Sequence, residues 1–156
     1  MKLNTKSRYG VRALFDMAYH GGGRPIQLKD IARRQRISDG YLEQVFQMLK
    51  QAGLIKAQRG PRGGYLLARP PEQTTVADIV LATEGWLGFV DCLRPTGKRS
   101  EECCEMQGKC VAKMVWAGAA EVLMAYLSSV TIKDLCVNAR QMGHESELAS
   151  RYVFHI

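Results

Sequence analysis

Apolar residues in the first fifty positions recur every three or four residues, which is the spacing of amphipathic helices. The first predicted helix begins at Ser7, a candidate N-cap, and ends at the three glycines 21–23. A second, shorter helix is predicted over about 28–35. A third follows after roughly three residues, so the second and third helices must cross at a steep angle. This arrangement is typical of a helix-turn-helix, and an ordinary helical hairpin inside a bundle is the alternative.

The third helix has clear start and stop signals. Ser38 is its candidate N-cap, and Ile37 and Leu42 flank that cap with the spacing of a hydrophobic staple. Gly53 occupies the position at which a left-handed residue ends a helix. The helix is therefore predicted to span about four turns between these two signals.

Two short strand-like runs, 54–59 and 65–68, follow the third helix. The glycine- and proline-rich segment 60–64 between them has the composition of a turn. A β-hairpin placed directly after a helix-turn-helix is a wing, which argues against the bundle. We therefore predict a mainly α fold with a small β-hairpin, in which residues 1–71 form a winged helix-turn-helix domain.

The second half of the chain is predicted to be helical around a long loop. Its segments are a connecting helix and turn (72–90), a cysteine-rich loop (91–110), a long dimerisation helix (109–130) and a short helix with a tail (131–156). Thr75 and Thr131 are candidate N-caps, and Asp134 completes a capping box that opens a last turn of helix. The long helix has apolar residues on more than one face, so we expect it to pair with the same helix of a second subunit. A core helix in a monomer is the alternative.

Charge is distributed unevenly along the chain. Residues 1–70 contain 14 Lys and Arg against 4 Asp and Glu, a net charge of +10, whereas residues 71–156 contain 8 against 11, a net of −3. A basic excess confined to one domain is expected of a surface that binds a polyanion, although a solvated basic surface without a partner has the same composition. No apolar run approaches the roughly 18 residues of a membrane span, and the N-terminus does not resemble a signal peptide. We therefore expect a cytoplasmic protein with no membrane partner.

The outward face of the third helix carries side chains suited to DNA. Gln44 can pair with adenine and Glu43 can accept from cytosine, while Tyr41 can donate to a phosphate. Arg59 and Arg62 at the wing tip suit phosphates or a narrow minor groove. The candidate DNA-binding residues are Ser38, Gly40, Tyr41, Glu43, Gln44, Arg59 and Arg62. In a dimer, two such helices predict a pseudo-palindromic operator on double-stranded DNA, with half-sites about one turn apart.

Four of the five cysteines lie between positions 92 and 110. Such a cluster in a cytoplasmic protein indicates metal binding or redox chemistry before a disulfide framework. Thiolates select zinc and iron–sulfur clusters, but the spacing does not match a zinc ribbon. The candidate ligands are Cys92, Cys103, Cys104 and Cys110, of which we expect three to bind, with free reduced thiols as the alternative. The remaining Cys136 is predicted to be a packing residue.

An enzyme with a cysteine nucleophile is the competing class of function. It would need a nearby histidine, yet His20, His144 and His155 belong to no local motif. The chain also lacks a glycine-rich loop that ends in Lys-Ser or Lys-Thr and binds phosphate. We therefore expect the protein not to be an enzyme.

Several motifs together resemble one known family. They are Ser-Arg-Tyr-Gly at 7–10, Tyr-Leu-Glu-Gln at 41–44, Gly-Leu-Ile at 53–55 and the wing sequence at 59–67. With them the chain resembles the IscR/NsrR-type family of bacterial winged helix-turn-helix transcription regulators, over residues 1 to about 135. The resemblance implies a homodimer that binds promoter DNA and, in many members, senses through an iron–sulfur cluster. It leaves RNA polymerase and cluster-assembly proteins as further candidate partners.

The resemblance also implies which cysteines would hold a cluster. Cys104 and Cys110 match the second and third cysteines of cluster-binding relatives, and Cys92 stands in place of the first after a longer gap. The insertion at 95–102 makes Cys103 a possible substitute for Cys104. The cluster would contain two or four irons, and its loss or oxidation would free the loop and shift the long helix.

The fourth ligand is where the chain departs from the family. Lys113 stands where cluster-supply sensors have a histidine, and Arg8 lies in the region where some nitric-oxide sensors have an acidic ligand. Glu101, Glu102, Glu105 or a neighbouring cysteine are the candidates that remain. The sequence therefore keeps two alternatives open: the same regulator with a thiol-oxidation switch instead of a cluster, and a protein-interaction or metal-trafficking module.

Overall fold

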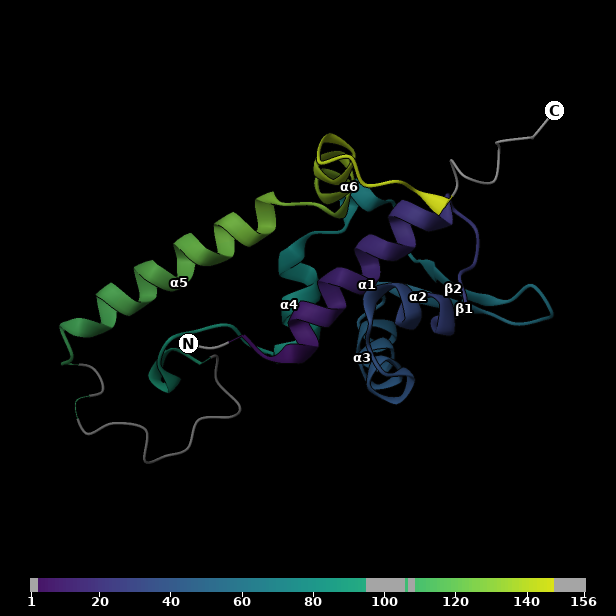
Figure 1. Cartoon of the computed structure of the whole chain (residues 1–156). Coiled ribbons are helices and arrows are strands. Elements are labelled where there is room, and N and C mark those ends of the chain that lie inside the picture. The colour runs from purple at the N-terminus through teal and green to yellow at the C-terminus, as the bar shows by residue number, and fades with distance from the viewer. Residues whose placement is uncertain (1–2, 95–105, 107–108, 148–156) are drawn as a thin grey trace.

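The computed structural model describes residues 3–94, 106 and 109–147 of the chain (Figure 1). The helices are α1 (Thr5–Gly21), α2 (Leu28–Gln35), α3 (Asp39–Gln51), α4 (Val76–Glu84), α5 (Ala112–Ser129) and α6 (Ile132–Gln141), with short 3₁₀ turns at Pro71–Gln73 and Asp91–Leu93. Strands β1 (Ile55–Gln58) and β2 (Gly64–Leu67) pair antiparallel, with Ile55 opposite Leu67. The predicted mainly α fold with one small hairpin is confirmed.

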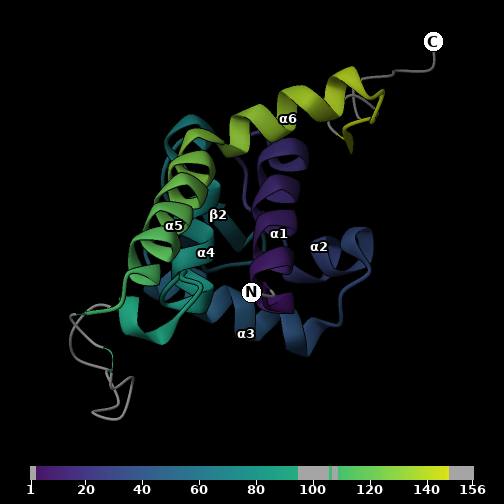
Figure 2. The same ribbon diagram turned by 90° about the vertical axis from the view of Figure 1, so that its left-hand side faces the viewer.

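The core surrounds α1, which contacts α2, α3, α4, α6 and β2. Figure 2 shows α1 at the centre of the molecule, with α4, α3 and α6 around it. Fully buried apolar side chains from five helices meet there: Leu14, Ile31, Leu42, Phe46, Ile79 and Ile132. Gly10 allows α1 and α4 to approach closely, because a Cβ at this position would lie only 2.9 Å from Cγ2 of Ile79.

The prediction that Ser7 caps the first helix is wrong. The N-cap is Asn4, whose side chain accepts a hydrogen bond from the backbone N–H of Lys6. Ser7 is buried one turn further on, where its hydroxyl lies 2.8 Å from that of Thr83 and donates to the Glu84 carboxylate. A residue type that commonly caps helices is here used to attach α1 to the end of α4.

The signals around the helix-turn-helix are borne out. Ser38 occupies the N-cap position of α3, although its side chain makes no capping hydrogen bond, and both staple residues, Ile37 and Leu42, are buried. Gly53 adopts φ +69° just after the end of α3. Arg36, in the connection between α2 and α3, also has a left-handed backbone (φ 53°), which is unusual for a residue with a Cβ.

Both predicted capping threonines carry complete capping boxes. The Thr75 hydroxyl accepts from the Asp78 backbone N–H at the start of α4, and Thr131 and Asp134 repeat this arrangement at α6. However, α6 continues for ten residues, well past the single turn predicted. It does so because Ile132 and Ala139, seven residues apart, are buried on the same side of the helix.

A buried ion pair joins α1 to α2. The Asp16 carboxylate is fully buried and accepts from Arg34 through Nε at 3.0 and 3.1 Å and through Nη2 at 2.6 Å. The Gln35 side-chain amide donates to the same carboxylate at 2.9 Å. Removing one partner of a buried pair of this kind typically costs about 3–5 kcal/mol, because the other charge is left without compensation.

The chain after α6 returns to the end of α1 beside this ion pair. The backbone N–H of Glu147 donates to Nδ1 of His20 at 3.1 Å, so this nitrogen must be unprotonated. Burial lowers the pKa of His20 from its usual 6.5, with Asp16 and Glu147 acting against this shift and Arg34 adding to it. The charged side chains of Arg24 and Asp30 line the same small cavity as His20.

This geometry predicts a pH dependence of stability. Because the pKa of His20 is lower in the folded chain than in the unfolded one, the unfolded chain takes up the proton more readily. The stability due to neutral His20 is therefore complete above about pH 6.5 and decreases as the pH falls toward the folded pKa. His20→Asn, which keeps an acceptor but does not titrate, should show a smaller decrease in Tm between about pH 7.5 and 5.5. His144→Asn, at an exposed histidine, is the matched control, and an equally steep decrease in His20→Asn would contradict the assignment.

Candidate DNA interface and cysteine segment

Helix α3 buries one side and exposes the side predicted to face DNA. Its buried residues are Leu42, Val45, Phe46 and Leu49. Ser38 at the cap and Gly40, Glu43 and Gln44 on the helix are all exposed. A Cβ added to Gly40 would meet nothing within 4 Å, so this part of the helix has an open approach for a ligand. The four residues thus form a continuous polar surface at the N-terminal half of α3.

Tyr41 differs from these residues because it is half-buried. Its ring packs edge-on against Tyr9 of α1, with 5.5 Å between the ring centroids. The guanidinium of Arg12 lies over the Tyr9 ring, 5.4 Å from its centroid. The orientation of Tyr41 is therefore set by α1. Sequence reasoning placed Tyr41 at the interface but missed its two supporting residues, although Tyr9 lies within the Ser-Arg-Tyr-Gly motif.

The wing is attached to the helix-turn-helix by backbone pairing. The N–H of Tyr65 donates to the carbonyl of Ile26 at 2.8 Å, and the N–H of Ile26 donates to the carbonyl of Tyr65 at 3.0 Å. Gly64 permits this crossing, because a Cβ there would collide with the Ile26 carbonyl. The Tyr65 ring also packs edge-on against Phe46 of α3, at 4.7 Å between centroids. The hairpin is thus fixed relative to α3.

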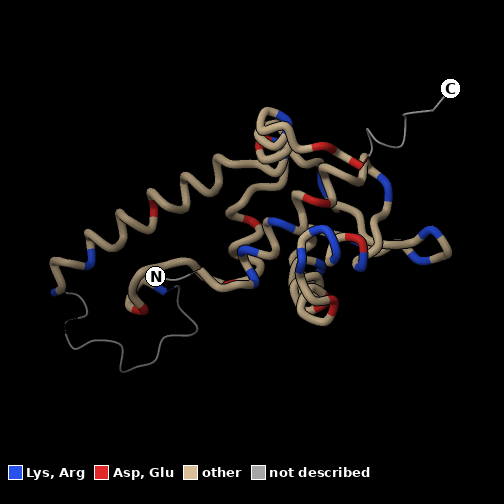
Figure 3. The backbone as a smooth tube through the Cα atoms, viewed as in Figure 1, with Lys and Arg blue, Asp and Glu red and all other residues tan. Residues whose placement is uncertain are grey.

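Basic side chains gather on this part of the molecule. Arg59 and Arg62 are exposed on the turn of the hairpin, which Figure 3 shows pointing away from the body with blue segments at its tip. Lys50 of α3 and Lys56 of β1, which are close to this turn in the sequence, are also exposed. Within the described part of the chain none of these four forms an ion pair, so their positive charge is available to a polyanion.

Two of the four candidate metal ligands lie among the described residues. Cys92 is in the 3₁₀ turn Asp91–Leu93 and Cys110 lies just before α5, and both are half-buried free thiols. Cys103 and Cys104 lie outside the described residues. In the ranges that are described, no three His, Cys, Asp or Glu side chains come together as a metal site. Cys136 packs against the core as predicted, and burial raises the pKa of its thiol.

Helix α5 projects from the body and contacts mainly α4 and the Cys92 turn (Figure 1). None of its residues is buried. Large apolar side chains at or just before it are strongly exposed: Val111, Met114, Val115, Trp116, Val122 and Tyr126. The Trp116 ring lies 6.4 Å from that of Phe89, which connects the start of α5 to the segment before Cys92. No helix in the described ranges is long and apolar enough to cross a membrane.

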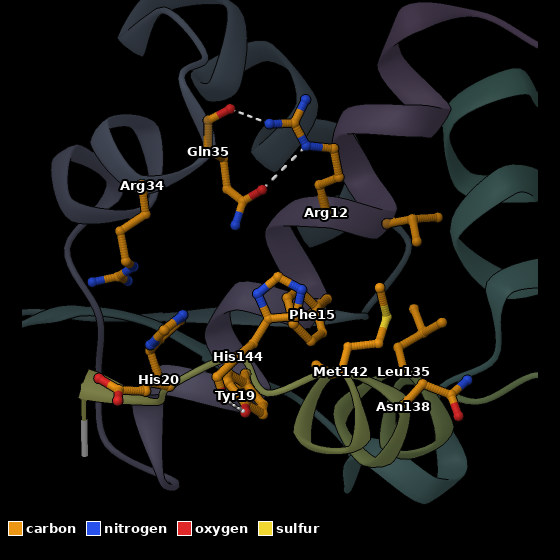
Figure 4. Close-up of a pocket in the computed structure, with 13 residues that line it drawn as sticks. Arg12, Phe15, Tyr19, His20, Arg34, Gln35, Leu135, Asn138, Met142 and His144 are labelled. Atoms are coloured by element: carbon orange, nitrogen blue, oxygen red, sulfur yellow. Dashed lines mark hydrogen bonds between the residues drawn. The ribbon is translucent and has the colours of Figure 1, made fainter. Parts of the chain in front are cut away.

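A cavity of about 750 Å³ lies between α1, the end of α2 and α6 (Figure 4). Phe15 and Tyr19 of α1 form one wall, and Leu135 and Met142 contribute the opposite side from α6 and its end. On the α2 side, the Arg12 guanidinium hydrogen bonds to Gln35 through both its side-chain and backbone oxygens.

Comparisons with known proteins agree with this architecture. The sequence model of the Rrf2 family, described as an iron-dependent transcriptional regulator, matches residues 3–138. The protein rrf2 of Nitratidesulfovibrio vulgaris is 40% identical over 139 residues, which cover 89% of each chain. The regulator IscR of Photorhabdus laumondii is 36% identical over 88% of this chain and 80% of its own.

Two solved structures extend the likeness to three dimensions. The IscR of T. potens superimposes with a TM-score of 0.69 at 37% identity, covering 89% of this chain and 88% of that one. CymR, the global cysteine regulator of B. subtilis, also gives a TM-score of 0.69, at 33% identity, and covers 88% of this chain and 98% of its own.

Proposed function

Because the chain belongs to the Rrf2 family of DNA-binding transcriptional regulators, we propose that it recognises a specific promoter sequence as a homodimer, through α3 and the wing. The relatives are helix-turn-helix regulators, and the chain is not an enzyme. The observation that carries the proposal is the exposed polar face of α3 beside a hairpin held in a fixed position and tipped with two arginines.

Each predicted DNA-binding residue has a role in this proposal. Gln44 and Glu43 face base edges in the major groove, where an amide can pair with adenine and a carboxylate can accept from cytosine N4. Gly40 lets the backbone approach the duplex, and Ser38 and Tyr41 donate to phosphates. The arginines of the wing, Arg59 and Arg62, enter the adjacent minor groove or bind its phosphates.

Substitutions on α3 and the wing should separate base recognition from phosphate binding. Gln44→Ala should weaken binding to the operator by about 1–3 kcal/mol and leave binding to a scrambled duplex unchanged. Arg59→Ala should weaken both and reduce the salt dependence of binding by about one unit of slope. The measurement is fluorescence anisotropy on an operator selected from random duplexes. Gln141→Ala and Lys133→Ala, on the exposed side of α6, are the matched controls. Equal affinity of the wild-type chain for operator and scrambled duplex would contradict the proposal.

The apolar surface of α5 supports the homodimer. Exposing the apolar surface of a helix to water is energetically unfavourable, and large exposed apolar patches mark interaction sites. Val122 and Tyr126 are 71% and 65% exposed, one turn apart on the same face of α5. A second copy of this helix supplies the complementary apolar surface and places two copies of α3 toward one duplex.

A charge on this face should dissociate the dimer. We expect Val122→Glu to weaken self-association at least about tenfold, because it places a carboxylate in an apolar contact. Sedimentation velocity over a concentration series measures the effect. Gln141→Glu adds the same charge at an exposed position of α6 and should sediment like the wild-type chain. A wild-type chain that sediments as a monomer at all concentrations would exclude this interface.

The cysteine segment is proposed to control the DNA affinity through an iron–sulfur cluster. The donor set fits such a group, because Cys92 and Cys110 are free thiols and thiolates are the usual ligands of these clusters. With Cys103 or Cys104 they would provide three ligands, and the bound cluster would supply redox chemistry. Cys92 and Cys110 both adjoin α5, Cys110 through the chain itself and Cys92 through the contact between its turn and the helix. A change at either cysteine would therefore act directly on α5, the proposed dimer helix.

Anaerobic purification tests the sensor. The wild-type protein should be coloured and contain iron and sulfide, and Cys92→Ala and Cys110→Ala should each lose the visible absorption. Cys136→Ala is the control that should keep it, because Cys136 belongs to the core side of α6. A colourless, iron-free wild-type protein that still binds its operator would overturn the cluster and favour direct thiol oxidation as the switch.

A further inference from the structure

We infer that Glu147, at the end of the described chain, is a positioning residue for DNA recognition. It holds the last turn of α2 and so helps to set the direction of α3. The inference rests on the proposed role of α3 in binding DNA. It is carried by a group of polar contacts around the last turn of α2.

The last turn of α2 is where the contacts converge. Arg34 and Gln35 are the final residues of that helix, and only three residues separate them from the first residue of α3. The conformation of this connection is fixed by Ile37, which is buried and whose backbone N–H donates to the carbonyl of Ala32 at 3.0 Å. Any movement of the end of α2 is therefore transmitted to the start of α3.

Two side chains of α1 hold this turn from one side. Asp16 binds Arg34 and Gln35 together. Arg12 donates to the side-chain oxygen of Gln35 at 3.1 Å and also to its backbone carbonyl. That carbonyl is one of those left without an intrahelical partner at a helix end. Arg12 thus acts as a cap on α2, while its guanidinium also lies over Tyr9.

Glu147 holds the same turn from the other side. Its carboxylate accepts from Nη1 of Arg34 at 2.8 Å, and its other oxygen lies 3.7 Å from Nη2 of Arg33. Arg34 is therefore shared between Asp16 of α1 and Glu147 of the C-terminal segment. Arg34 is only 13% exposed, so the two pairs are partly shielded from solvent.

The segment that carries Glu147 is itself firmly attached to α1. The Tyr19 hydroxyl donates to the carbonyl of His144, and the Ser146 hydroxyl donates to the carbonyl of Tyr19 at 2.7 Å. The backbone N–H of Glu147 donates to His20. The segment also directly continues α6, which follows the dimer helix α5 in the chain. Glu147 therefore connects α5 and α6, which precede it in the chain, to the end of α2 in the helix-turn-helix.

A cavity lies beside these contacts. The open space of Figure 4 lies between α6 and the end of α2, and residues of both line it. Arg34, which donates to the Glu147 carboxylate, is among the residues that line this cavity. Without this carboxylate, the side chains that hydrogen bond to the last turn of α2 would be those of α1, Asp16 and Arg12.

Glu147→Gln tests the inference with little risk to the fold. The side chain is 40% exposed, and Arg34 keeps its pair with Asp16, so no buried charge is left unpaired. We expect operator affinity to decrease about 3- to 10-fold while affinity for a scrambled duplex stays unchanged. Glu145→Gln removes the same charge two residues earlier, where the carboxylate pairs with no other described residue, and should bind like the wild-type chain.

A double-mutant cycle with Gln44→Ala distinguishes positioning from general stabilisation. If Glu147 directs α3, Gln44→Ala should cost less in the Glu147→Gln background than alone, by about 2- to 5-fold in affinity. Strictly additive effects, or an equal loss on operator and scrambled duplex, would overturn the inference alone. A wild-type chain without preference for its operator would instead overturn the proposed function, and the inference with it.

Discussion

The buried carboxylate of Asp16 is the constraint on which the arrangement of the DNA-binding half depends. A charge with no solvent exposure must be compensated, and among the described residues the donors come from Arg34 and Gln35 of α2. This requirement fixes where α2 ends relative to α1. Since α3 begins only three residues later, the same requirement sets the position of α3, the proposed recognition helix. Apolar packing alone tolerates small sliding of helices, whereas a bidentate ion pair specifies one register.

Helix α1 connects the two halves of the protein. At one end Ser7 and Gly10 bring it against α4, to which α5 is adjacent. In the same part of the helix, Tyr9 and Arg12 support Tyr41 and the end of α2. Its last turn receives the segment that follows α6. Helix α1 makes no proposed base contact, yet it offers one path from α5 and α6 to α3, beside the direct contact of α4 with α3.

Local chemistry was sufficient to predict much of the fold. The staple around Ser38, the capping boxes at Thr75 and Thr131 and the glycine-rich hairpin turn all depend on residues within a few positions of each other. Features that depend on distant partners were missed. Ser7 is a plausible cap until its partner Thr83, 76 residues later, is known. The contact between Arg34 and Glu147 spans 113 residues and joins two residue types that are common on surfaces, so no local sequence pattern predicts it.

The pairing of Ile26 with Tyr65 has a consequence for how operators can vary. It holds the hairpin and α3 in a fixed relative position, so in the proposed complex the offset between the groove that α3 enters and the groove that the wing contacts would be constant. Each half-site would then have a fixed length. In the proposed dimer, differences between promoters in the spacing of the two half-sites would then be accommodated by the α5 helices at the symmetry axis, or by bending of the duplex.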